Sequence, residues 1–120
     1  MILIITMLVS VTVTDSLATE LTKSSHGIKA TLKTTPGKNM VDIYLYDSKT
    51  LKPVKEARVS AKITLPDRTG VERELMGMAM DGAFSYMNSL DFSQKGRYKF
   101  DILVDAGSAP VKFSFVLDEK

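Results

Sequence analysis

The chain has 120 residues, of which 44% are hydrophobic and 25% are charged, and its formal net charge is +2. This composition is that of a globular protein, and the length accommodates one domain. Cysteine is absent and histidine occurs once, at His26. Disulfide frameworks, thiolate metal sites and polyhistidine metal sites are therefore excluded. The small net charge also speaks against a nucleic-acid-binding protein.

The N-terminal segment has the character of a secretory signal. Residues 2–13 are almost all apolar or β-branched. A run of about 12 residues is too short for a membrane-spanning helix, which needs ~20, and small residues at Ser16 and Ala18 predict cleavage after Ala18. The usual basic start is missing, because the first basic residue is Lys23. A buried first strand and a membrane anchor truncated at its front stay open as alternatives.

The expected organisation therefore has three parts. Residues 1–18 are the predicted signal peptide, residues 19–26 a leader, and residues 27–120 the folded domain. The expected location is periplasmic or secreted, and membrane anchoring follows only if the N-terminal segment stays uncleaved.

Seven segments of the domain alternate apolar and polar residues, which predicts β-strands. They are residues 27–33, 40–47, 57–65, the two segments that flank Asp81-Gly82, 97–105 and 111–117. No segment shows a convincing helical period. The pattern predicts an all-β fold, a single seven-stranded antiparallel immunoglobulin-like β-sandwich. Ile63, Phe100 and Phe113 are central to their alternating runs and are predicted to be buried, and Tyr98 resembles the tyrosine that anchors a sandwich corner.

The residues needed for common catalytic sites are not found. Serine–histidine–acid catalysis would need His26 as the base, but His26 falls in the expected leader and the chain has no G-x-S-x-G motif. Glu72 and Glu74 share one face of a predicted strand beside Arg73, a pattern typical of a solvated edge. Glycine-rich phosphate loops and an exposed aromatic platform are absent as well. We therefore expect no enzyme activity and no nucleic-acid partner.

Methionine is concentrated around one predicted turn. Five methionines follow the predicted cleavage site, namely Met40, Met76, Met78, Met80 and Met87. Asp81-Gly82 favours a two-residue hairpin turn, and such a turn pairs Met76 with Met87 and Met78 with Ser85. Directly paired residues share a face of a sheet. Met76, Met78, Met80 and Met87 are thus predicted to lie on one outward face, opposite Phe84 and Tyr86.

Thioethers are soft ligands that select Cu(I), and they form no disulfide in an oxidising compartment. Met76, Met78, Met80 and Met87 are therefore candidate metal ligands, and His26 joins them if the leader folds back over this sheet. Three alternatives stay open. A three-residue loop would shift the register by one and turn the methionines into the core; the N-terminal segment or a protein partner could cover the face; and His26 could simply be solvated.

The order of several short segments resembles the YtkA-like and FixH-like domains. They are Gly37-Lys38-Asn39, Tyr46-Asp47, Lys52-Pro53-Val54, Ala57-Arg58-Val59, Leu65-Pro66, 81–86, Gly96-Arg97-Tyr98 and 113–116, and the similarity covers roughly residues 25–118. The resemblance implies an exported or membrane-anchored β-sandwich associated with copper handling and respiratory oxidase assembly. One departure concerns ligands: the family's Met-Pro-x-Met segment is replaced by Leu65-Pro66-Asp67-Arg68, so the family's usual ligand positions do not transfer.

The resulting expectation is an exported, non-enzymatic accessory protein in copper handling or respiratory-complex assembly. It would bind Cu(I) through the four methionines Met76, Met78, Met80 and Met87. The rival expectation is a structural or adaptor β-sandwich that docks another envelope protein and binds no metal.

Overall fold

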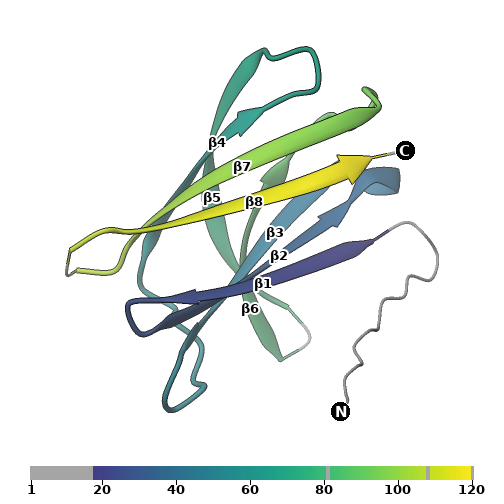
Figure 1. Cartoon of the computed structure of the whole chain (residues 1–120). Coiled ribbons are helices and arrows are strands. Elements are labelled where there is room, and N and C mark those ends of the chain that lie inside the picture. Colours follow the sequence, from purple (N-terminus) through teal and green to yellow (C-terminus); the bar gives the residue numbers. More distant parts are fainter. Residues whose placement is uncertain (1–17, 81, 108, 120) are drawn as a thin grey trace, which may run out of the picture.

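The computed structural model describes residues 18–80, 82–107 and 109–119 (Figure 1). The strands are β1 (Thr19–Ser25), β2 (Ile28–Thr35), β3 (Met40–Asp47), β4 (Arg58–Thr64), β5 (Gly70–Met80), β6 (Ala83–Ser89), β7 (Gly96–Asp105) and β8 (Val111–Glu119). The 3₁₀ helix η2 (Pro36–Lys38) links β2 to β3. In these three ranges, no helix is long and apolar enough to cross a membrane. Apart from Ala18, the predicted signal peptide lies outside the described residues.

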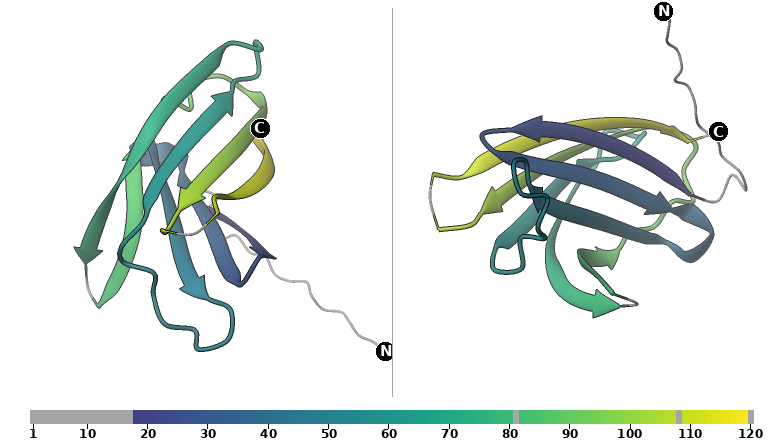
Figure 2. Two further views of the ribbon diagram at one scale, coloured as in Figure 1. Left: turned by 90° about the vertical axis from the view of Figure 1, so that its left-hand side faces the viewer. Right: turned by 90° about the horizontal axis from the view of Figure 1, so that it is seen from below.

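The eight strands form one antiparallel sheet in the order β1-β2-β3-β6-β5-β4-β7-β8. Strand β5 belongs to both halves of this sheet. Its residues 70–75 pair with β4, and its residues 76–80 pair with β6. The sheet bends along β5, so that its two halves face each other and roll into a nearly closed barrel (Figures 1 and 2).

The barrel is closed by side chains where its two edge strands, β1 and β8, lie side by side (Figure 1). Among the described residues, no backbone ladder joins these strands. Instead, the Lys23 ammonium donates a hydrogen bond to the carbonyl oxygen of Ser114 and lies 5.6 Å from the centroid of the Phe115 ring. This position allows a cation–π contact in addition to the hydrogen bond.

The prediction of an all-β antiparallel fold is confirmed, but the count of seven strands is wrong. The additional strand is β1, which lies in the segment expected to be a leader and pairs with β2 along its whole length. Leu21 is the one large apolar residue of β1, so the segment shows no alternation that sequence reasoning could detect. The sandwich of two separate sheets is not what is observed either, because β5 makes the sheet continuous.

The core fills the interior of the barrel with the inward residues of the alternating strands. Ile63 and Phe100 are 0% exposed and Phe113 is 3% exposed, as predicted. Tyr98 is also fully buried, and its hydroxyl donates a 2.7 Å hydrogen bond to the carbonyl oxygen of Gln94, four residues upstream. This is the geometry of a tyrosine corner, and it gives Tyr98 the structural role that was expected.

Candidate functional site

The β5–β6 hairpin has the register that its sequence predicts. Met76 pairs with Met87, Met78 with Ser85 and Met80 with Ala83. Gly82 has a φ of 79°, a left-handed value that suits the second position of such a turn. The alternative of a three-residue loop, which would turn the methionines inward, is therefore wrong.

Met76 and Met78 lie on the outer face of the sheet, where their side chains are 64% and 46% exposed. Met87 lies on the same face, because it pairs directly with Met76. Its side chain is half-buried. Met80 belongs to the same register, but its side chain lies outside what the structure describes. The hairpin thus brings at least three of the four candidate sulfur ligands to one surface.

The inner face of the same hairpin explains this orientation. Phe84 and Tyr86 point into the barrel, with their rings edge to face and their centroids 5.3 Å apart. Gly77 lies opposite them, and a Cβ added there would be only 2.7 Å from Cζ of Phe84. The Tyr86 hydroxyl also donates a 2.7 Å hydrogen bond to the carbonyl oxygen of Val54. Because Phe84 and Tyr86 pack on the inner face of the hairpin, the methionines at the alternate positions lie on its outer face.

Strand β3 adds two residues to this face that the sequence analysis did not include. In the β3–β6 ladder, Asp42 pairs with Met87 and Met40 pairs with Ser89. Both therefore share the outward face with the methionines of the hairpin. Met76, Met87 and Asp42 form one row across three neighbouring strands. We call the surface formed by Met40, Asp42, Met76, Met78, Ser85 and Met87 the methionine face.

Asp42 is unusual because it points away from the core and is nevertheless buried, with 8% exposure. The Ser85 hydroxyl donates a long hydrogen bond of 3.4 Å to its Oδ1 atom. Burial raises the pKa of the Asp42 carboxyl above its ordinary value, and this effect outweighs the opposing influences of Ser85 and of the positive charge of Lys33. A carboxylate in this position is desolvated and lies directly opposite a methionine.

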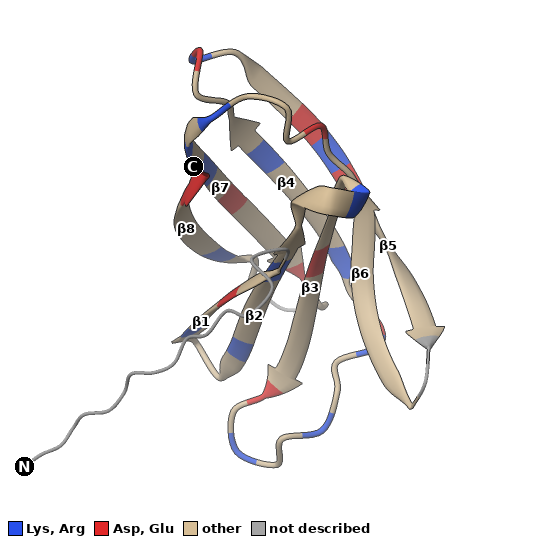
Figure 3. Cartoon of the chain, turned by 90° about the vertical axis from the view of Figure 1, so that its right-hand side faces the viewer, with Lys and Arg blue, Asp and Glu red and all other residues tan. Residues whose placement is uncertain are grey.

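The methionine face is otherwise neutral. Residues 75–80 and 82–90 contain no charged side chain, and β6 and the adjoining half of β5 are correspondingly tan in Figure 3. In the described part of the chain, no three His, Cys, Asp or Glu side chains form a group that could hold a metal ion. A cation held at this face would therefore depend on sulfur.

His26 lies apart from this face. It occupies the β1–β2 turn with a positive φ of 49°, followed by Gly27 at 81°. Its Nδ1 atom is 2.8 Å from the Ser25 hydroxyl, and its ring is exposed. Strand β3 separates β2 from β6, and two views show the β1–β2 turn well apart from strands β5 and β6 (Figures 1 and 2). The structure does not bring His26 together with the methionines.

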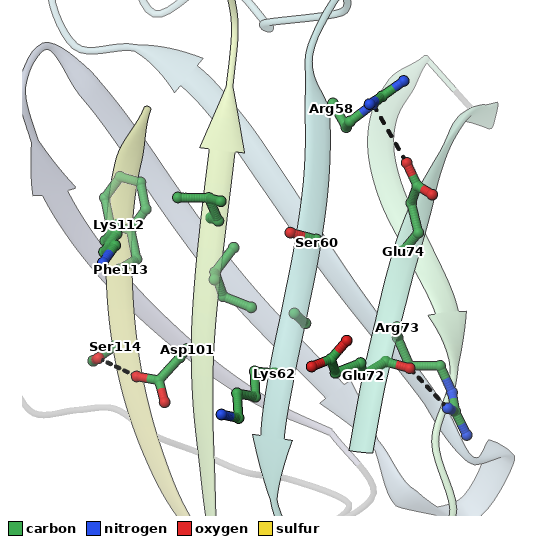
Figure 4. Close-up of a pocket in the computed structure, with 13 residues that line it drawn as sticks. Arg58, Ser60, Lys62, Glu72, Arg73, Glu74, Asp101, Lys112, Phe113 and Ser114 are labelled. Atoms are coloured by element: carbon green, nitrogen blue, oxygen red, sulfur yellow. Dashed lines mark hydrogen bonds and ion pairs between the residues drawn. The ribbon is translucent and has the colours of Figure 1, made fainter. Parts of the chain in front are cut away.

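The other half of the sheet carries a groove of about 760 Å³ on the outer faces of β4, β5, β7 and β8, lined by both polar and apolar residues (Figure 4). Both signs of charge line it. Arg58 and Glu74 approach to 3.5 Å, and the Ser114 hydroxyl donates a 2.6 Å hydrogen bond to Asp101. Among the side chains that the structure describes, none of those lining this groove is a methionine. It is therefore a useful contrast to the methionine face, with a similar aspartate–serine pair but no sulfur.

No family model matches the sequence, and no curated protein matches it. Solved structures, by contrast, share its fold. FetP from uropathogenic Escherichia coli strain F11 aligns with a TM-score of 0.72 at 10% identity, covering 84% of this chain and 95% of FetP.

Two further structures are similar. The copper-reconstituted P19 protein of Campylobacter jejuni has a TM-score of 0.68 at 9% identity, covering 86% of this chain and 96% of P19. A DUF4426 family protein from Pseudomonas aeruginosa PAO1 has a TM-score of 0.65 at 18% identity, covering 82% of this chain and 93% of that protein. At these identities the likeness establishes a shared fold along nearly the whole length of each protein.

Proposed function

We propose that this chain is an exported, non-enzymatic binding module that handles copper, and that it holds Cu(I) through Met76, Met78, Met80 and Met87. The proposal includes a role as an accessory protein of the YtkA-like or FixH-like kind, in copper handling or respiratory-complex assembly. The observation that carries it is the register of the β5–β6 hairpin, which gathers exposed thioethers on one outward face.

The spacing of Met76, Met78 and Met87 suits a single ion, and Met80 lies two residues beyond Met78 on β5. Alternate residues on a strand are ~6.6 Å apart, and paired residues on neighbouring strands are ~5 Å apart. Thioether side chains have three rotatable bonds and span such gaps. Sulfur ligands without charge favour Cu(I) over harder divalent cations. Met87 lies at the centre of the arrangement, since it pairs with Met76 and lies two residues from Ser85, the partner of Met78.

The comparisons support the proposal at the level of the fold. P19 is described in its copper-reconstituted form, and a variant of FetP, which is 10% identical to this chain, is copper-bound. The same barrel is thus compatible with copper binding in other proteins. Export has separate support from the apolar character of residues 2–13 and the small residues before the predicted cleavage site. A periplasmic or secreted location completes the proposal.

A second function is favoured by the exposure of the same face. Met76 and Met78 are large, exposed apolar side chains on the uncharged strand segments 75–80 and 82–90, and Met-rich surfaces adapt to protein partners. In this alternative the chain is an adaptor that docks another envelope protein through the methionine face and binds no metal. The two functions differ in whether sulfur is needed. Methionine-to-leucine variants distinguish them, because leucine supplies similar apolar area without a lone pair.

The test is a competition titration with Cu(I) under reducing, anaerobic conditions. The variant Met78→Leu/Met87→Leu nearly conserves side-chain volume, so the fold should persist, and we expect its Cu(I) affinity to fall at least about tenfold. The control is Val116→Leu, an aliphatic exchange at an exposed position of β8, which should bind as the wild type does. Equal affinity in the double variant and the wild type, or no binding by the wild type, would overturn the copper proposal.

A further inference from the structure

We infer that the cation site of the methionine face extends onto β3, where Asp42 contributes a carboxylate ligand and Met40 a further thioether. The inference rests on the proposed function, because it names additional ligands of the same site. It also specifies the ligand class: a soft monovalent cation whose single positive charge is neutralised by one carboxylate within a ring of sulfur atoms.

The register places both residues within reach of Met87. Asp42 is its direct partner across the β3–β6 ladder, and Met40 pairs with Ser89, two residues further along β6. Direct partners have Cβ atoms ~5 Å apart, and diagonal neighbours are ~7–8 Å apart, still within the reach of long side chains. A cation bound to the Met87 sulfur would therefore have Met76 on the β5 side and Asp42 with Met40 on the β3 side.

Charge gives Asp42 a distinct role. Thioethers are neutral, so methionines alone would leave a bound cation uncompensated at a partly buried site. A desolvated carboxylate attracts a cation more strongly than an exposed one, because less water screens the interaction. On β3, β5 and β6, Asp42 is the carboxylate that combines an outward position with burial.

The remaining contacts of Asp42 leave its oxygen atoms available. A carboxylate offers about four lone-pair positions, and the hydrogen bond from Ser85 is long. Across the ladder on the β2 side, Asp42 pairs with Lys33. No ion pair within 4.0 Å joins Asp42 to Lys33 or to any other residue of the described ranges. The carboxylate is thus oriented by Ser85 but not neutralised, which is the state expected of a preformed cation ligand.

The test compares Asp42→Asn with Asp101→Asn. Asparagine keeps the shape of the side chain and an oxygen that can accept the Ser85 hydrogen bond, but it removes the charge. Asp101 is the matched control, since it also accepts a serine hydrogen bond and lies in the groove without methionines. With Cu(I) or Ag(I) alone as the probe, we expect Asp42→Asn to bind at least about tenfold more weakly than the wild type. Asp101→Asn should bind as the wild type does.

A second measurement follows the individual methionines. With methyl-labelled methionine, Ag(I) should shift the methyl resonances of Met40 and Met87 in the wild-type protein. Met40→Leu should weaken binding without unfolding the protein, as circular dichroism would verify.

The outcomes separate the two proposals. Wild-type affinity in Asp42→Asn, or an unshifted Met40 methyl resonance while Met87 shifts, would overturn the extension onto β3 and leave the copper proposal standing. Absence of binding by the wild type would overturn both.

Discussion

Gly77 lies against the ring of Phe84, so closely that a Cβ at position 77 would be 2.7 Å from the Cζ atom. Gly77→Ala should therefore force the Phe84 ring away from Tyr86, its edge-to-face neighbour. We expect a loss of about 1–3 kcal/mol in the free energy of unfolding, as is usual for an overpacked core. Denaturant unfolding monitored by circular dichroism measures this loss.

The matched control for Gly77 is Gly70, which lies in the same strand and has nothing within 4 Å of an added Cβ. Gly70→Ala should be neutral or slightly stabilising, because alanine restricts the unfolded chain. A similar loss in both variants would show that the cost arises from the strand backbone and not from Phe84.

The tyrosine corner provides a second stability prediction. Tyr98→Phe removes the donor to the Gln94 carbonyl oxygen and should cost about 0.5–1.5 kcal/mol. Tyr46→Phe is the control, because no hydrogen bond of the Tyr46 hydroxyl occurs among the described residues and the side chain is only half-buried. Thermal or denaturant melts compare the two; an equal effect in both would contradict the role of the corner.

Phe100 tests the packing of the core. Its side chain is 0% exposed and stacks beside Tyr98 with the ring centroids 6.4 Å apart. Phe100→Ala should cost about 3–5 kcal/mol, because it removes buried surface and leaves a cavity. Denaturant unfolding is again the measurement. A loss below about 1 kcal/mol would be incompatible with the burial of this strand face.

Asp42 should make stability depend on pH in a defined direction. Burial raises the pKa of its carboxyl in the folded state above 3.8, so the folded protein binds this proton more tightly than the unfolded chain does. The contribution of Asp42 to stability is therefore most favourable at acid pH and declines as the pH rises through the raised pKa.

Asp42→Asn removes this dependence, since asparagine does not ionise. We expect the variant to be more stable than the wild type at about pH 7 and nearly equal to it at about pH 3. Urea unfolding of both proteins across this range isolates Asp42, because the other carboxyls are common to the two. A difference that stays constant with pH would contradict the assignment.

Cleavage of the N-terminal segment is directly testable. Small residues before position 19 predict a mature protein that begins at Thr19, and β1 begins at that same residue, so cleavage after Ala18 leaves every described strand intact. Intact-mass measurement of protein recovered from the cell envelope should show the mass without residues 1–18. A soluble cytoplasmic protein that retains these residues would contradict export.

Much of the fold was predictable because most strands bury alternate residues. The β7 residues Tyr98, Phe100 and Ile102 alternate with less buried neighbours and are all buried. Strand β1 was not predicted, because its Thr, Ser, Lys and Glu side chains do not alternate between apolar and polar residues. As an edge strand, it is held mainly by backbone hydrogen bonds to β2.

The candidate site was predictable only within the hairpin. Two strands joined by a two-residue turn have a register fixed by that turn, so the partners of Met76 and Met78 followed from Asp81-Gly82. The position of Asp42 depends on β3 pairing with β6, two strands that are separated along the chain by β4 and β5. Such a long-range pairing is decided by tertiary packing, and local pattern does not encode it.

The sharing of β5 between both halves of the sheet has a consequence for the way this protein unfolds. Leu75 is the last β5 residue paired with β4, and Met76 is the first paired with β6, so the two ladders meet at one peptide bond. If the hydrogen bonds of either ladder break, β5 is no longer held in place for pairing in the other ladder. Native-state hydrogen exchange should accordingly find no separate opening of one half: the amides on both sides of that peptide should exchange together, through global unfolding.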